Sequence, residues 1–398
     1  MDDLPAGAEK VGDREAGFRV GDGFRRFSQR NDIFCRSFWD PVVQSDRSDM
    51  FYETYRTPRM RWRNVDGFTQ RDYALRNASW HVTDVFAEMR EQGDRREGFL
   101  DPYSVLREGP GVRAEVESEE VGAREIKHVA RTFGADLVGF TGYDERWVYT
   151  HAYSRDGEEE KPQELPADLP HVIVIAQSMD LGLIGTVPSA LSGTATGLGY
   201  SKDTLVLLAV SQYILNLGYR AVPTMNDTAL AIPLAIKAGL GEYGRHGLLI
   251  TPEFGPRVRL GKIFTDFPLA HDRPRRFGVQ ETCEVCRRCS DACPAKAIAS
   301  GEPTSQVHNR SNIVGVTKWT TDAERCFRFW SNQNTDCSIC VRVCPYNRDF
   351  SKWWNRAWRW MAGGPLRRLA LWLDGRSGRG DRKTPSQWGS PARIGRRP

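Results

Sequence analysis

Two groups of four cysteines carry the clearest chemistry in this sequence. The chain has 398 residues and nine cysteines, and eight of the cysteines lie between residues 276 and 350. The first group follows a C-x2-C-x2-C-x3-C-P pattern, and the second ends in the same way after a ten-residue gap. In chain order the groups are Cys283, Cys286, Cys289 and Cys293, then Cys326, Cys337, Cys340 and Cys344.

This spacing is typical of a bacterial unit that binds two [4Fe–4S] clusters. Three thiolates on a tight turn ligate one cluster, and the fourth, which precedes the proline, ligates the other. Disulfides suit small secreted domains, and zinc sites lack paired Cys-Pro endings, so both interpretations are disfavoured. The predicted ligands are Cys283, Cys286, Cys289 and Cys344 for the first cluster, and Cys326, Cys337, Cys340 and Cys293 for the second.

The composition is that of a folded protein with a basic end. Hydrophobic residues make up 40% of the chain and charged residues 27%, enough for two or three packed units. From residue 351 onward 12 Lys and Arg face 2 acids, a local charge of +10 against +5 for the whole chain, so the remainder is at −5. A slightly acidic main body disfavours nucleic-acid binding.

The sequence shows no membrane-spanning or secretion signal. It has no apolar run of 18 or more residues, and its first residues lack a cationic segment followed by an apolar one. We therefore expect a cytoplasmic protein, with an exported mature form peripheral to the inner membrane as the alternative.

Helical and strand patterns alternate between about residues 120 and 265. This alternation indicates an α/β layered domain. Residues 1–110 show weak periodicity and predict irregular structure with short helices. The expected helices are 122–133, 203–218 and 228–239, and the expected strands are 135–140, 171–177, 246–251 and 259–265.

Several segments resemble the corrinoid- and iron–sulfur-dependent reductive dehalogenase family. They are NDTA at 226–229, the stretch IPLAIKAGLGEYGRHGLLITPEFGPRVRLGKIFTDFPL at 232–269, the first cysteine motif, and Lys318-Trp319 with Asp322 before Cys326. FSQRNDIFCR at 27–36 and SMDLGLIGTVPS at 178–189 are also similar to that family. The likeness extends over roughly residues 20 to 350.

The resemblance implies an α/β (α+β) fold, with a nitroreductase-like core that binds a corrinoid, followed by the ferredoxin-like module. It implies that electrons from an external low-potential donor pass through the two clusters to a base-off cobalamin-type cofactor, which removes halide from a small organohalide. No Asp-x-His-x-x-Gly stretch supplies a histidine lower ligand, consistent with the base-off form. The oligomeric state is not indicated.

The same resemblance divides the chain into four parts. Residues 1–110 form an N-terminal extension that is a candidate cover for the active site. Residues 111–275 form the corrinoid-binding core, with an insertion at about 142–170, and residues 276–350 form the cluster unit. Residues 351–398 form a basic, tryptophan-rich tail with two interpretations, a lid over the second cluster or a peripheral contact with an anionic membrane. Beyond residue 375 we expect a flexible end.

The family's catalytic Tyr, Asn and Arg fall on Tyr200, Asn226 and Arg259 by the order of the flanking motifs. A tyrosine can supply the proton that carbon–halogen cleavage needs, and a nearby cation that stabilises the phenolate makes it a better donor. Tyr243 is the alternative donor. The structural alternatives are that Tyr200 and Asn226 cap helices and that Arg259 pairs with an acid.

Other residues carry weaker expectations. Cys35 is interpreted first as a buried thiol, although it and Phe34 lie in a segment that could close over the cobalt. Trp330 could line the pocket or be an ordinary packed aromatic residue. The glycines of 192–201 could let the backbone approach the corrinoid.

Two other functions remain open at this point. One is an epoxyqueuosine-reductase-like enzyme, which would carry an acidic residue in place of Tyr200 and a Gly-Trp-x-Gly-Lys-Asn-like stretch in place of residues 241–247. The other is a non-catalytic two-cluster electron carrier, which would not need some 275 residues ahead of its cysteines.

Overall fold

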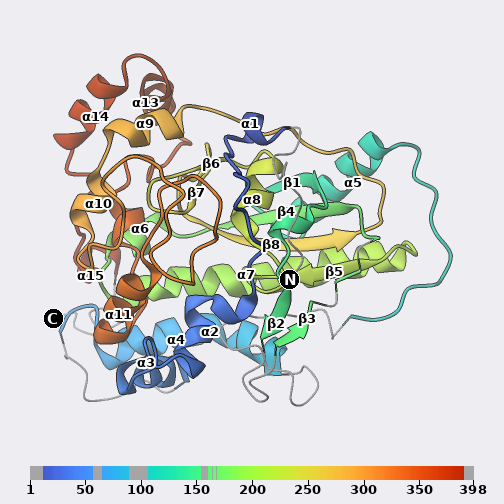
Figure 1. Cartoon of the computed structure of the whole chain (residues 1–398), viewed down its shortest axis with the longest axis horizontal. Coiled ribbons are helices and arrows are strands. Elements are labelled where there is room, and N and C mark those ends of the chain that lie inside the picture. Colours follow the sequence, from blue (N-terminus) through green and yellow to red (C-terminus); the bar gives the residue numbers. More distant parts are fainter. Residues whose placement is uncertain are drawn as a thin grey trace.

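A four-stranded antiparallel sheet forms the centre of the protein (Figure 1). In the computed structural model, the described residues are 12–56, 65–88, 106–153, 160–163, 165–166 and 168–389. The strands, in sheet order, are β1 (Leu137–Gly142), β4 (His171–Ser178), β8 (Val258–Thr265) and β5 (Ala221–Thr224). Two short hairpins lie outside this sheet, β2 (His151–Tyr153) with β3 (Glu160–Pro162), and β6 (Glu242–Tyr243) with β7 (Leu249–Ile250).

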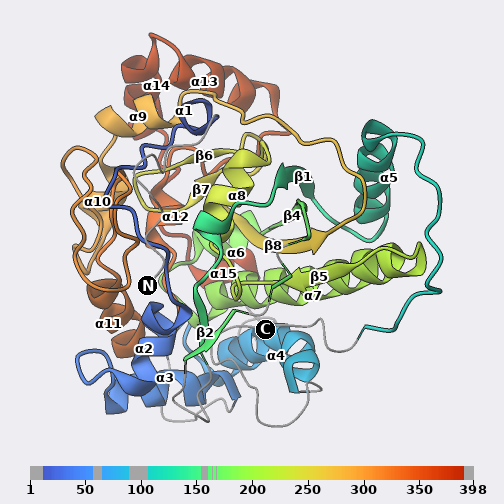
Figure 2. The same cartoon turned by 45° about the vertical axis from the view of Figure 1, so that its right-hand side comes forward.

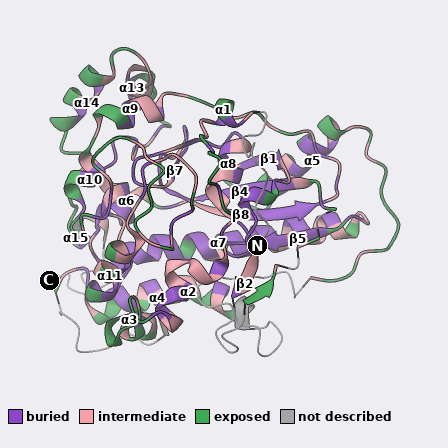
Figure 3. Cartoon of the chain, in the orientation of Figure 1, coloured by how far each residue is buried: buried purple, intermediate pink, exposed green. Residues whose placement is uncertain are grey.

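Helices cover both faces of the sheet, so the expected mixed α/β layered fold is confirmed. Helices α5 (Glu119–Thr132) and α7 (Ala190–Asn216) pack on one face, and α8 (Ala231–Lys237) packs on the other. Successive residues of a strand point to opposite faces, so Ile173 and Ile175 join the α7 core while Val172 and Val174 join the α8 core. The sheet and α7 are the most buried elements (Figure 3).

Helix α7 begins earlier than the helix expected at 203–218. It has 27 residues and begins at Ala190, where Ser189 caps it by accepting a hydrogen bond from the Ser192 N–H. Gly and Thr are weak helix formers in isolation, so residues 192–201 give little helical signal in the sequence. Here tertiary packing overrides that weak propensity, because most of the first half of the helix is buried.

Helix α4 corrects the expectation that the N-terminal 110 residues hold only short helices. It covers Gln70–Glu88, and α3 covers Asp46–Arg56. Helix α4 packs against α7 through polar residues that fit beside glycines: a Cβ on Gly193 would lie 2.8 Å from Arg76 Cδ, and one on Gly197 2.3 Å from Ser79 Oγ. A polar contact face produces no apolar periodicity, so the sequence pattern did not reveal it.

The cluster unit follows β8 and contains four helices. Asp322 caps the helix that carries Cys326 by accepting a hydrogen bond from the Arg325 N–H. The helices are α9 (Val279–Val285), α10 (Arg288–Ala292), α11 (Ala323–Gln333) and α12 (Ile339–Val343). The remaining short elements are α1 (Asp13–Ala16), η1 (Gln29–Asn31), α2 (Ile33–Trp39), η3 (Glu145–Trp147) and α6 (Leu181–Gly185).

The tail folds into helices α13 (Trp353–Gly363), α14 (Arg367–Gly375) and α15 (Pro385–Trp388). Trp358 and Ala370 join a core with Cys283 and Cys344, so helices α13 and α14 pack beside the first cysteine set. Further along the tail, Gly380 contacts Arg342 and Val343, and Val343 packs against cysteines of the second set. Figure 2 shows α13 and α14 next to α9.

The expectation of a flexible end beyond residue 375 was wrong for residues 376–389. The Lys383 N–H donates to the Gly185 carbonyl, and α15 contacts α6. Residues 390–398 lie outside the described residues, as do parts of the N-terminal 110 residues. In the described part of the chain no helix is both long and apolar enough to cross a membrane. The four-part division stays a prediction.

Candidate functional site

The eight motif cysteines gather into two groups in space. The Cys286 and Cys289 thiols act electrostatically on Cys283, and all three act on Cys344. These four cysteines line one cavity with about 300 Å³ of empty space, together with His246, Thr282, Pro345 and Tyr346. The first predicted ligand set therefore surrounds a common space, although the cysteines come from both motifs.

The second group has the complementary membership. Cys326 lies within electrostatic reach of Cys337 and Cys293, and the same neighbours act on Cys340. Each motif thus sends its last cysteine to the other group, as the Cys-Pro spacing predicts. Across the described residues, no three His, Cys, Asp or Glu side chains converge closely enough to hold a single metal ion.

Burial makes these thiols poor acids in the absence of iron. It raises the pKa to about 12 for four of them, Cys283, Cys289, Cys326 and Cys337. The thiolate is the form that ligates iron, and a cluster supplies the positive charge that stabilises several thiolates in a buried space. The donor set therefore fits two [4Fe–4S] clusters, while the role of each cysteine stays a prediction.

Asn226 and Arg259 both contact Tyr200. The Asn226 Nδ2 atom donates a hydrogen bond to the Tyr200 hydroxyl, and Arg259 Cζ lies 5.0 Å from the centre of the Tyr200 ring. Tyr200 comes from the middle of α7, Asn226 from the turn after β5, and Arg259 from β8. Three separate elements therefore bring together the three residues that the resemblance implied.

The helix-capping alternatives for Tyr200 and Asn226 do not hold. Tyr200 is inside a helix and not at its end, and Asn226 does not cap α8, whose N-cap is Leu230. The Arg259 charge acts on the buried carboxyl of Asp203, so the alternative that Arg259 interacts with an acid stays open. The catalytic roles of the three residues stay predictions.

The glycines of α7 make room for side chains of this site. A Cβ on Gly199 would lie 2.5 Å from Arg259 Cγ, so glycine lets the arginine lie against the helix beside Tyr200. On the other side of Tyr200, the Trp80 ring packs at 4.7 Å between ring centres. Gly193 and Gly197 contact α4, and Gly199 contacts Arg259. The approach of these glycines to a corrinoid stays a prediction.

The other singled-out residues lie in different surroundings. The alternative donor Tyr243 donates its hydroxyl hydrogen to the Trp319 carbonyl, 3.1 Å away, and burial raises its pKa. Phe34 packs on Trp330 with 5.7 Å between ring centres. Cys35 is fully buried beside Tyr153, in agreement with the default interpretation.

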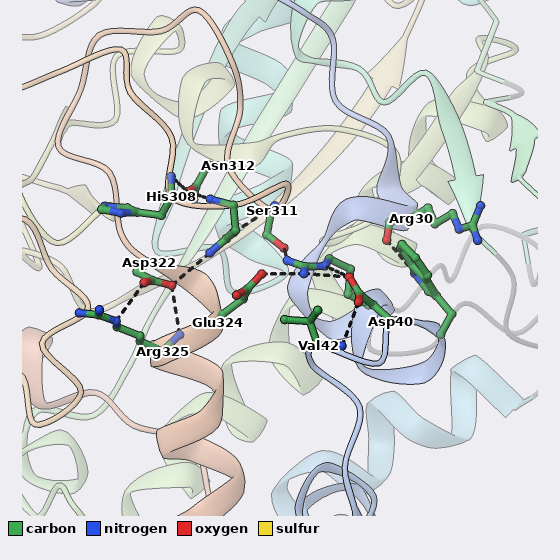
Figure 4. Close-up of polar contacts among 12 residues, drawn as sticks. Arg30, Asp40, Val42, His308, Ser311, Asn312, Asp322, Glu324 and Arg325 are labelled. Carbon is green, nitrogen blue, oxygen red and sulfur yellow. Dashed lines mark hydrogen bonds and ion pairs between the residues drawn. The ribbon is translucent and has the colours of Figure 1, made fainter.

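The N-terminal segment is tied to the helix that carries Cys326. The Arg36 Nη2 atom lies 2.8 Å from Asp40 Oδ2 and 2.6 Å from Glu324 Oε1. Figure 4 shows Asp40 and Glu324 facing each other across this contact. The segment before the sheet therefore braces the second cysteine group.

Sequence reasoning missed three residues that connect the two halves of the site. Asp336, next to Cys337, accepts a hydrogen bond of 2.9 Å from Thr196 Oγ1, one helical turn before Tyr200. Arg245 and His246 reach the first cysteine group. The stretch around 241–247 was noted for its resemblance, but no spacing rule marks a contact between residues so far apart in the chain.

The exchanged cysteines can be tested by replacing them in pairs and measuring iron in the reconstituted protein. Cys283→Ala with Cys344→Ala should remove one cluster and leave about four irons, because both thiols belong to one set. Cys283→Ala with Cys293→Ala should disrupt both clusters. If Cys283→Ala with Cys344→Ala disrupted both clusters, and Cys283→Ala with Cys293→Ala removed only one, each motif would hold its own cluster.

Comparisons with known proteins agree with this geometry. Residues 153–269 match the family model "Reductive dehalogenase subunit", and residues 282–347 match "4Fe-4S double cluster binding domain". The fold also resembles a solved catabolic reductive dehalogenase, NpRdhA, with a TM-score of 0.70 and 19% identity, over 95% of this chain and 49% of that chain.

Two tetrachloroethene reductive dehalogenases are similar in sequence. The protein from Desulfitobacterium hafniense is 36% identical over 288 residues, which are 63% of this chain and 52% of the relative. This chain therefore spans about half the length of that relative. The protein from Sulfurospirillum multivorans is 30% identical over 376 residues, which are 83% of this chain and 74% of the relative. At this identity and coverage, the chain belongs to the reductive dehalogenase family.

Proposed function

We propose that this protein is an oxidoreductase that removes halide from a small organohalide, R–X + 2e⁻ + H⁺ → R–H + X⁻. The observation that carries the proposal is the contact of Tyr200, Asn226 and Arg259 in a chain that also holds two groups of cluster cysteines. The reaction needs two electrons, which the clusters can transfer, and one proton, which Tyr200 can donate. The electrons come from an external low-potential donor.

The chemistry at the carbon–halogen bond would be supplied by a base-off corrinoid bound in a nitroreductase-like core at residues 111–275. A corrin ring carries amide groups on its rim, so a site for it needs neutral polar partners. Gln177 is the register neighbour of Arg259, and both of its amide atoms are buried without a hydrogen-bond partner among the described residues. The Thr224 hydroxyl, two residues before Asn226, is also buried without a hydrogen-bond partner among the described residues. These groups fit such a ligand.

The hydrogen-bond direction at Tyr200 suits a proton donor. Asn226 donates to the phenol oxygen, so the phenol hydrogen is free to point toward a substrate. When that proton leaves, the oxygen becomes negative, and both the Asn226 N–H and the Arg259 charge stabilise it. The neighbours of Tyr200 therefore stabilise the phenolate that remains after proton transfer.

Burial around Tyr200 suits an apolar substrate. The Tyr200 side chain is 8% exposed and packs against Trp80. Tyr55 continues this aromatic wall, with its ring centre 5.6 Å from that of Trp80. Small halogenated molecules are mainly apolar, and aromatic walls bind such ligands while excluding water.

The role of Tyr200 is tested by Tyr200→Phe. We expect the variant to bind its cofactors normally but to release halide about 10²- to 10⁴-fold more slowly, the usual contribution of a positioned acid. The measurement is halide release with a low-potential chemical reductant, alongside iron and cobalt content. Tyr243→Phe is the matched control, because it removes a phenol that donates elsewhere. Normal turnover in Tyr200→Phe would place the proton donor on another group.

The tail carries an outward face that suits an anionic membrane surface. Trp353, Trp360 and Trp372 are 68%, 76% and 52% exposed. Helix α14 also exposes Leu369 and Leu373, at helical spacing with Trp372. Arginine accompanies these side chains, and Arg376 Cζ lies 3.7 Å from the Trp372 ring centre. Exposed Trp and Leu with Arg at their edges are typical of helices that lie in the headgroup region of a bilayer.

This membrane contact predicts a lipid and salt dependence. The protein should sediment with vesicles that contain phosphatidylglycerol, less with phosphatidylcholine alone, and less as salt is raised, because salt screens the attraction. Replacing Trp360 and Trp372 by Ser should lower the bound fraction severalfold. Phe133→Ser is the control, because it changes an exposed aromatic residue directly after α5, and α5 lies at the opposite end of the molecule from α13 and α14 (Figure 1). Equal binding of all variants to both lipids would contradict the proposal.

A further inference from the structure

Two adjacent residues of the turn between β6 and β7 reach into the first cysteine group. Arg245 and His246 belong to the sheet-bearing part of the chain, yet both contact residues of the cluster unit. The Arg245 backbone N–H points at Cys283 Sγ, 3.5 Å away. The turn therefore brings polar groups from outside the cluster motifs to one of the two cysteine sets.

The Arg245 side chain places a buried charge next to that set. It is 1% exposed, and its guanidinium donates only to backbone carbonyl oxygens. The bonds are 2.7 Å from Nη2 to the Cys283 oxygen, and 2.9 and 2.8 Å from Nη1 to the oxygens of Ala299 and Gly301. Trp319 lies against it, 4.8 Å from Cζ to the ring centre. No carboxylate in the described ranges forms an ion pair with it, so its charge is available to the cluster.

The side-chain contacts of Arg245 include the backbone of the first cysteine group. Its Nε and Nη2 atoms donate to the Cys283 carbonyl, and Nε also donates to the Cys286 carbonyl at 3.2 Å. Arg342, on the helix α12 that carries Cys340 of the second group, instead donates to the Gly380 carbonyl and is only half-buried. Arg245 is therefore the more deeply buried of these two cations.

His246 contributes a hydrogen-bond donor. Its Nδ1 atom accepts from the Leu248 N–H at 3.2 Å, so the neutral ring carries its hydrogen on Nε2. Nε2 is buried without a partner among the described residues, and His246 lines the cavity of the first cysteine group. A sulfur atom of a bound cluster is the acceptor that this cavity can provide.

We propose that Arg245 and His246 raise the reduction potential of the first cluster relative to the second. One-electron reduction adds negative charge to a cluster, and a fixed cation and an N–H donor stabilise that charge in a buried site. Both residues would set the reduction potential of this cluster. Neither would contact the substrate, so they are not catalytic residues. The proposal rests on the cluster assignment of the proposed function and does not depend on dehalogenation.

The test is an EPR-monitored redox titration of the full, reconstituted chain. In Arg245→Gln the equilibrium constant for reduction of one cluster should fall at least tenfold, which is 59 mV for one electron. The midpoint of the other cluster should stay in place. Arg245→Lys keeps the positive charge, so its midpoint should lie close to that of the unmodified chain. His246→Phe, which removes the donor but keeps a ring, should lower the same midpoint by a smaller amount.

Arg342→Gln identifies the other cluster. Arg342 acts on Cys337, so this variant should move the second midpoint and not the first. If Arg245→Gln fails to assemble, His246→Phe decides the question alone. Unmoved midpoints, equal shifts of both midpoints, or a shift of the same midpoint by Arg245→Gln and Arg342→Gln would overturn the proposal. Such results with a full iron content would leave the proposed dehalogenation untouched.

Discussion

Eight thiols crowded into two buried groups impose the constraint on which the rest of the structure depends. Burial disfavours the thiolate form, and neighbouring thiols repel one another once they ionise. Iron relieves both effects, so the cysteine groups and their clusters stabilise each other. Because each motif supplies its last cysteine to the other group, neither half of the cluster unit is complete alone. The flanking contacts of Arg36, Asp336 and Arg245 then fix this unit against the sheet and the N-terminal helices.

Helix α7 couples the cluster unit to the proton-donor site. Thr196 touches Asp336 beside the second cysteine group, and Tyr200 follows one turn later on the same helix face. Glycines on this helix admit Arg76 and Trp80 from α4 and Arg259 from β8 without displacing the backbone. The glycines of α7 therefore let residues of α4 and β8 pack closely against this helix.

Much of the site could be predicted from the sequence, because cysteine spacing is a local pattern with a direct chemical meaning. The buried strands β4 and β8 were also predicted to within one residue of their ends. In β4 the signal is a continuous run of β-branched residues. Helix α4 and the first half of α7 were missed, because their packing uses Gly, Ser and Arg and leaves no apolar period. The contact of Tyr200, Asn226 and Arg259 came only from the family resemblance.

The contacts of Arg245 and of the tail were beyond any local pattern. Arg245 lies 38 residues before Cys283, and its partners are backbone carbonyls, which carry no sequence signature. The tail had two interpretations, a lid over the second cluster or a membrane contact. Helices α13 and α14 lie by the first set, because Cys344 belongs to that set and its neighbour Tyr346 packs against Trp358. Chain order is a poor guide where ligands are exchanged.

Metal content after reconstitution with iron, sulfide and cobalamin tests the central claim most directly. After unbound cofactor is removed, the account predicts about eight irons and one cobalt per chain, with the EPR signal of a five-coordinate base-off Co(II). A chain that holds its full complement of iron but no cobalt would be an electron carrier, and the account given for Tyr200, Asn226 and Arg259 would be wrong.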